Sequence, residues 1–72
     1  MSFQAYLDNI KAKTGKKPEE FVKLAEKKKF IQKGVLDPKV KAGQIVQWLK
    51  DDFNLGHGHA MAIVAYFKGK RD

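Results

Sequence analysis

Apolar residues recur at the spacing of a helix in four stretches of the chain, and each stretch predicts one apolar stripe. The predicted helices cover about residues 3–14, 18–29, 42–53 and 58–68. Their apolar positions form the predicted core: Phe3, Tyr6, Leu7, Ile10, Phe21, Leu24, Ile45, Trp48, Leu49, Phe53, Ile63, Val64 and Phe67. No stretch alternates apolar and polar residues over the length of a strand. The pattern predicts an all-α fold of four short helices in one domain, residues 1–72.

Residues with known preferences for helix ends stand at the borders of these stretches. Ser2 is suited to cap the first helix, and Pro18 fits the first position of the second. Gly15, Asn54 and Gly69 each follow an apolar stretch and are suited to the left-handed conformation that often ends a helix. The predicted borders therefore have a physical basis besides the apolar pattern.

The longest connection between the predicted helices, residues 30–41, contains turn signals at Gly34 and at Asp37-Pro38. It also carries too many apolar residues for a free linker. We expect it to pack onto the core between the two pairs of helices.

The most informative local feature lies between the last two predicted helices, where two glycines and two histidines alternate. So few residues separate these helices that they must form a tight hairpin. The pattern Gly56-x-Gly58-x-x-x-Ala62, within residues 42–68, resembles the glycine-bearing turn of helix-hairpin-helix DNA-binding motifs. In that family the backbone amides of the turn hold a DNA phosphate, and amides at a helix start attract anions on general grounds. A purely structural turn is the alternative.

Charge adds a second argument for an anionic partner. The net charge is +7, and residues 15–41 hold nine Lys against four acids. A basic balance of this kind is typical of proteins that bind nucleic acid, although a lysine-rich surface also serves solubility alone. The candidate phosphate-binding residues are Gly56, His57, Gly58, His59, Lys41 and Lys50.

The same histidines could serve a metal or a reaction, and the sequence favours neither. His57 and His59 are two residues apart, whereas metal ligands on one helix normally stand at i and i+4. The chain has no cysteine, one serine and one threonine, and no nucleophile, base and orienting group can be assembled from it. We predict no metal, no cofactor and no enzyme activity.

Two functions remain in competition. The first is a non-enzymatic module that contacts nucleic-acid phosphate through the hairpin amides and surface Lys. The second is a protein-interaction or accessory domain, in which Leu36, Val40 or Tyr66 belongs to an exposed apolar patch. The sequence does not indicate the oligomeric state.

Cellular location rests on the absence of certain signals. The N-terminal residues lack a basic region followed by an apolar core, and no apolar run approaches the roughly 18 residues that span a bilayer. The lack of cysteine fits a reducing compartment. We expect a soluble cytoplasmic protein without membrane contact.

A resemblance extends over nearly the whole chain. It rests on four separated segments in one order: residues 2–7, Lys13-Thr14-Gly15-Lys16, residues 41–50 and residues 55–60. Together they resemble a bacterial family, the domain of unknown function numbered 4287. The resemblance implies a bacterial cytoplasmic domain and supplies no catalytic residue. Gln44 stands where an acidic residue is expected in that family, which argues against a charged role at this position.

Overall fold

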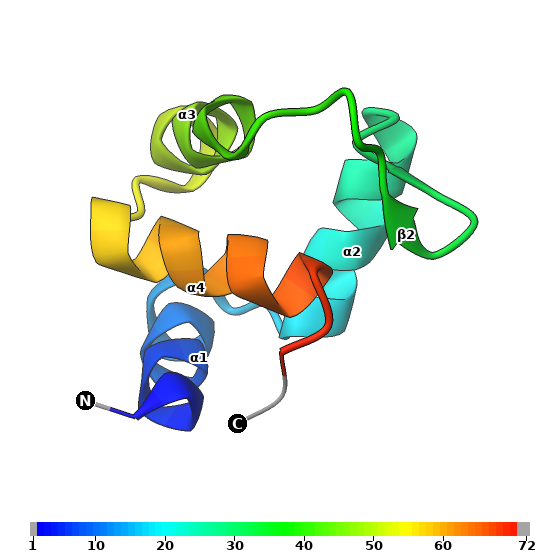
Figure 1. The fold of residues 1–72 in the computed structure, drawn as a ribbon. Coiled ribbons are helices and arrows are strands. Elements are labelled where there is room, and N and C mark those ends of the chain that lie inside the picture. Colours follow the sequence, from blue (N-terminus) through cyan, green and yellow to red (C-terminus); the bar gives the residue numbers. More distant parts are fainter. Residues whose placement is uncertain (1, 71–72) are drawn as a thin grey trace.

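The computed structural model describes residues 2–70 and contains four helices and one short β-hairpin (Figure 1). The elements in chain order are α1 (Phe3–Thr14), α2 (Pro18–Lys27), β1 (Ile31–Gln32), β2 (Val35–Leu36), α3 (Ala42–Phe53) and α4 (His57–Phe67). The four predicted helices are all present. α4 begins and ends one residue earlier than predicted, and α2 ends two residues earlier.

Side chains near the helix starts satisfy amides that have no partner within the helix. The Ser2 hydroxyl accepts a hydrogen bond from the Ala5 amide at 3.1 Å, which confirms Ser2 as the cap of α1. At α3, the Gln44 side chain accepts a hydrogen bond from the Lys41 amide at 2.9 Å. Gln44 therefore caps its own helix without a charge.

Residues with positive φ follow all four helices, and one of them was not foreseen. Gly15, Asn54 and Gly69 follow α1, α3 and α4 with φ of 75°, 55° and 106°, as predicted. After α2, Lys29 takes this conformation with φ of 67°, and the Phe30 amide bonds to the carbonyl of Ala25 at 2.9 Å. The predicted second helix ran to residue 29 because Lys, unlike Gly, gives no signal for such an ending.

The all-α prediction is wrong in one place, because residues 31–36 form an antiparallel hairpin. Ile31 pairs with Leu36, and Gln32 pairs with Val35. Lys33 and Gly34 form the two-residue loop with φ of 55° and 77°, and positive φ at both positions is typical of a tight hairpin turn. Each strand has only two residues, which is too short for an alternating pattern to reveal. The prediction that this connection packs on the core is confirmed, since Ile31 is buried.

α4 is the central element, and it packs against each of the other three helices (Figure 1). Nine predicted core residues are buried: Leu7, Ile10, Phe21, Ile45, Trp48, Leu49, Ile63, Val64 and Phe67. Phe3, Tyr6, Leu24 and Phe53 are only partly buried and pack against this core from outside. The core also includes buried residues that were not predicted, namely Ala25, Ile31, Val46, Leu55, Ala60, Ala62 and Tyr66.

Within residues 2–70, no helix has both the length and the apolar character needed to cross a bilayer.

Candidate functional site

The glycine-histidine turn, residues 54–59, joins α3 to α4 as the tight hairpin that the sequence predicts. Its bend comes from Asn54, which adopts the left-handed conformation and donates its amide to the carbonyls of Leu49 and Lys50. Leu55 then turns inward and is only 2% exposed. The direction of α4 is therefore set by Asn54 and by burial of Leu55.

The two glycines do not make this bend. Gly56 is the cap residue of α4 with φ of −70° and ψ of 167°, a conformation that any residue adopts. A Cβ at Gly56 would have no atom within 4 Å, and one at Gly58 would lie in ordinary contact with the Tyr6 ring at 3.7 Å. Neither Gly56 nor Gly58 has positive φ. Neither glycine is required by the geometry of the turn.

The backbone amides at the start of α4 have the arrangement expected of an anion site. The first bond within the helix runs from the Ala60 amide to the Gly56 carbonyl at 2.9 Å, so the amides of His57, Gly58 and His59 precede it. The cap residue, Gly56, has no side chain that could accept a hydrogen bond from these amides. Gly56, His57 and Gly58 are exposed, so an anion could approach.

Side-chain charge around the turn does not support an anion site. Lys50 lies in the last turn of α3, but the next two residues are Asp51 and Asp52, and all three are exposed. Lys41 caps the opposite end of α3, nine residues or about 14 Å of helix axis from Lys50. The structure thus brings Lys50 to the turn together with two carboxylates and leaves Lys41 at the far end of α3.

The two histidines have different surroundings. The His59 ring packs edge-on against the Tyr6 ring, with centroids 5.2 Å apart, whereas His57 is exposed. Among residues 2–70, no group of three or more His, Cys, Asp or Glu side chains is placed to hold a metal ion. His59 therefore joins the start of α4 to α1 by packing.

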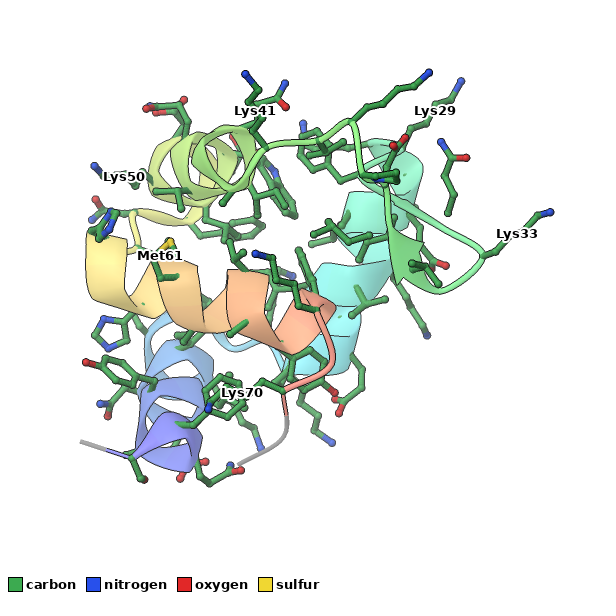
Figure 2. All side chains as sticks on the ribbon, viewed as in Figure 1. Lys29, Lys33, Lys41, Lys50, Met61 and Lys70 are labelled. Carbon is green, nitrogen blue, oxygen red and sulfur yellow. The ribbon has the colours of Figure 1, made fainter. Side chains whose placement is uncertain are left out.

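A stronger concentration of positive charge lies elsewhere, in what we call the basic connection, residues 27–41. It runs from the end of α2 through the hairpin to the start of α3. Its six lysines, all exposed, are Lys27, Lys28, Lys29, Lys33, Lys39 and Lys41. Figure 2 shows Lys29, Lys33 and Lys41 projecting outward from this part of the molecule.

Asp37 is the one acid of the basic connection, and its carboxylate is used locally. It accepts hydrogen bonds from the Lys39 amide at 2.8 Å and from the Gln32 side chain at 3.3 Å. These bonds hold the chain where it leaves the hairpin. Asp37 is thereby tied to the backbone that carries the lysines. Six lysines against this one carboxylate give the surface its positive balance.

Two lysines of the basic connection hold an unfavourable backbone conformation. Lys29 and Lys33 have φ of 67° and 55°, where a residue with a Cβ costs about 1–2 kcal/mol relative to the right-handed region. Glycine or asparagine is the usual residue at a helix end or hairpin loop of this kind. The dipeptide Lys33-Gly34, between Ile31-Gln32 and Val35-Leu36, was the signal in the sequence that could have indicated the hairpin.

Two residues of the basic connection, Lys28 and Phe30, contact the Trp48 ring of α3. The Lys28 ammonium lies 5.7 Å from the centre of the Trp48 ring, and Phe30 packs edge-on against the same ring at 5.7 Å. Trp48 is 7% exposed and belongs to the core, as predicted. The segment that carries the lysines is therefore fixed to the core at Phe30, which packs against Trp48, and at the buried Ile31.

The structure defines a small helical domain with one β-hairpin and a lysine-rich surface beside it. Residues 2–69 match the domain of unknown function DUF4287, and the chain belongs to this family. No curated protein and no solved structure matches the chain. The comparisons do not show the similarity of residues 42–68 to helix-hairpin-helix motifs.

Proposed function

We propose that this domain is a non-enzymatic module that binds the phosphate backbone of nucleic acid through the basic connection. The observation that carries the proposal is the set of six exposed lysines against one acid within residues 27–41. Lysine ammonium groups are suited to hydrated contacts with phosphate that do not read base sequence. The expected binding is therefore salt-dependent and largely independent of sequence.

Backbone strain at two of these lysines supports the same surface. Unfavourable φ values are found more often at functional positions than elsewhere, because selection for function offsets the loss of stability. Lys29 and Lys33 both have such values, and both ammonium groups belong to the basic connection. A role in stability alone would favour Gly or Asn at either position.

In this proposal the glycine-histidine turn contributes less to phosphate binding than the basic connection does. Its amides can add one phosphate contact, but Asp51 and Asp52 lower the local positive potential. Most of the affinity is therefore assigned to the basic connection.

The alternative of a protein-interaction domain loses part of its support. Tyr66 was expected in an exposed apolar patch, but it is 9% exposed and its hydroxyl donates a hydrogen bond to Glu19 at 3.2 Å. Leu36 and Val40 are partly buried and pack against the core. These three residues do not form the exposed patch on which that alternative relied.

Fluorescence anisotropy with labelled single-stranded DNA, duplex DNA and RNA, at several salt concentrations, tests the proposal. On duplex DNA, each phosphate contact adds about 0.9 to the slope of log affinity against log salt, so six lysines set an upper limit of about 5. Amide chemical shifts should change mainly in residues 27–41. Absence of binding at low salt would overturn the proposal, and shifts confined to residues 55–60 would assign the site to the turn.

A further inference from the structure

The β-hairpin of the basic connection has one face on the core and one face toward solvent. Ile31 is 3% exposed, and its partner Leu36 is partly buried and packs against the core. Gln32 and Val35 form the next pair, and both are exposed. Because paired residues share a face and successive residues alternate, this second pair lies on the opposite face of the hairpin. The inner pair therefore fixes the hairpin, and the outer pair is open to a partner.

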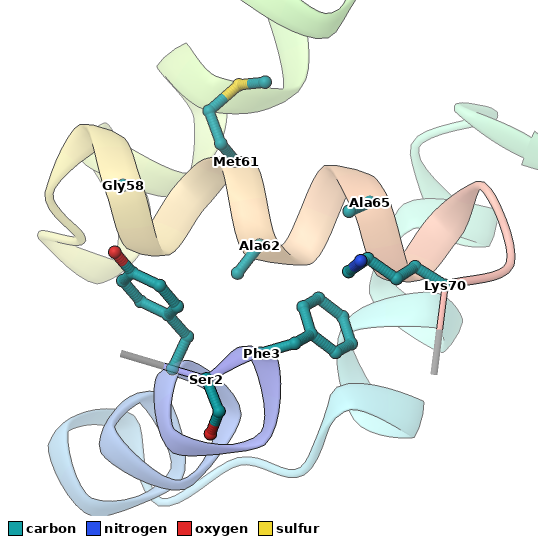
Figure 3. A pocket seen from close by; sticks show the side chains of 8 residues that line it. Ser2, Phe3, Gly58, Met61, Ala62, Ala65 and Lys70 are labelled. Atoms are coloured by element: carbon teal, nitrogen blue, oxygen red, sulfur yellow. The ribbon is translucent and has the colours of Figure 1, made fainter. Parts of the chain in front are cut away.

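The hairpin tip, residues 32–35, carries an exposed apolar side chain among lysines. Val35 is 65% exposed, and Met61 is the one other large apolar residue that is exposed within residues 2–70. Met61 projects from α4 on the side away from Phe3 (Figure 3), outside the basic connection. Val35 is therefore the apolar contact that the basic connection offers to a partner.

The size of the hairpin tip fits one groove of B-form DNA. Beyond the pair of Ile31 and Leu36 the chain advances two residues to Lys33, or about 7 Å at the rise of a strand. The major groove is about 8.5 Å deep and about 12 Å wide and admits a two-stranded ribbon, whereas the minor groove is only about 6 Å wide. Figure 1 shows the loop of the hairpin extending beyond α2, and Figure 2 shows Lys33 pointing outward from it. The tip can therefore enter a major groove ahead of the helices.

The aromatic residues favour a duplex over a single strand. Proteins that bind single strands commonly stack the bases on exposed aromatic rings. None of the aromatic side chains within residues 2–70 is exposed, and Phe30 of the basic connection packs edge-on against Trp48. The basic connection therefore offers ammonium groups for phosphates but no ring on which an unpaired base could stack.

We propose that the hairpin tip enters the major groove of B-form duplex DNA. Lys33 then lies within the groove, Val35 contacts the C5-methyl group of a thymine, and lysines on both sides of the hairpin, among them Lys29 and Lys39, reach the phosphates. This inference rests on the proposed phosphate binding and adds to it the form of the nucleic acid and the groove. The preference for thymine is small, because a single apolar contact produces it.

Three duplexes of equal length and corresponding sequence test the inference. They are DNA, the same DNA with uracil in place of thymine, and RNA. The first two differ only in the C5-methyl group, which lies in the major groove. We expect the thymine duplex to bind about fourfold more tightly than the uracil duplex, as burial of one methyl group predicts. It should bind at least roughly fivefold more tightly than the RNA, whose major groove is deep and narrow. Equal binding in either comparison would overturn the inference.

A variant at the tip assigns the methyl contact to Val35. Val35→Ser removes both methyl groups at an exposed position, so it should bind the thymine and uracil duplexes equally, with an unchanged salt slope. Met61→Ser removes an exposed apolar side chain outside the basic connection and should keep the fourfold difference. Circular dichroism verifies that both variants fold. A fourfold difference that persists in Val35→Ser would contradict the inference.

The same measurements separate this inference from the proposed function. Salt-dependent binding of equal strength to all three duplexes would leave phosphate binding by the basic connection intact and would remove the hairpin tip from the groove. Absence of binding to every duplex at low salt would overturn both. Amide shifts that include residues 32–35 on the thymine duplex are the result expected if the tip enters the groove.

Discussion

The basic connection and the glycine-histidine turn could both meet an anion, but the structure equips them differently. The turn offers three backbone amides at the start of α4, beside one Lys and two Asp. The basic connection offers six exposed lysines and one Asp. A distinctive sequence motif therefore marks the weaker of the two electrostatic surfaces.

The two regions also differ in how their backbone is held. At the turn, the left-handed position is occupied by Asn54, a residue that tolerates it, and Leu55 is buried directly after it. In the basic connection, the left-handed positions 29 and 33 are occupied by lysine. The residues of the turn suit its backbone conformation. In the basic connection, lysine at positions 29 and 33 lowers stability and places positive charge there.

Leu55→Ala tests the structural role of the turn and should have the largest effect. Leu55 is 2% exposed, and removing a buried leucine side chain costs about 2–5 kcal/mol. Urea denaturation measures the loss, with Met61→Ala as the control because Met61 is 39% exposed and should cost less than about 1 kcal/mol. A loss as small as the control would mean that Leu55 does not anchor the turn.

The double variant Lys33→Gln with Lys39→Gln tests the basic connection. Both side chains are exposed, and losing two phosphate contacts should reduce the salt slope on duplex DNA by about 2 and weaken binding roughly tenfold at low salt. Lys11→Gln with Lys13→Gln removes the same charge from α1 and should change the slope by less than half as much. Equal losses in the two doubles would indicate that net charge alone governs binding.

Lys33→Asn separates stability from binding at one residue. Asn-Gly is favoured in a two-residue hairpin loop, so relief of the φ of 55° should stabilise the domain by about 1 kcal/mol, or roughly 4–8 °C in Tm. DNA affinity should fall at the same time because one ammonium group is lost. Lys39→Asn loses the same charge at a position without positive φ and should bring no gain in Tm. A destabilised Lys33→Asn variant would contradict the strain argument.

His57→Glu should have the smallest effect and tests the amides of the turn. A carboxylate in the first turn of α4 favours the helix by about 0.3–1 kcal/mol and would repel a phosphate at the same amides. If the basic connection is the main site, DNA affinity should fall no further than in Ala12→Glu, which adds the same charge on α1. A much larger fall in DNA affinity in His57→Glu than in Ala12→Glu would mean that the turn, and not the basic connection, is the main phosphate-binding site.

Much of the fold was predictable because its helices carry local signals. The apolar stripes located all four helices, and Ser2, Gly15 and Asn54 marked ends that the structure confirms. The hairpin was missed because two-residue strands are shorter than any alternating pattern. The end of α2 was misplaced because Lys29 adopts a conformation that its side chain does not favour.

The candidate site was predictable only in part. The sequence indicated a tight turn and amides at the start of the last helix, and the structure shows that Asn54 and Leu55 determine the bend. Lys41 and Lys50 were both named as candidate phosphate-binding residues, and α3 holds them at its opposite ends.

The central position of α4 has a consequence for how the domain is made. α4 packs against α1, α2 and α3, and it is the last of the four in the chain. During synthesis, the first three helices therefore leave the ribosome before their common packing partner exists. We expect the core to form in a single late step, once residue 67 has emerged, so that slow release of the chain exposes Phe21, Ile45 and Leu49 to solvent or to chaperones.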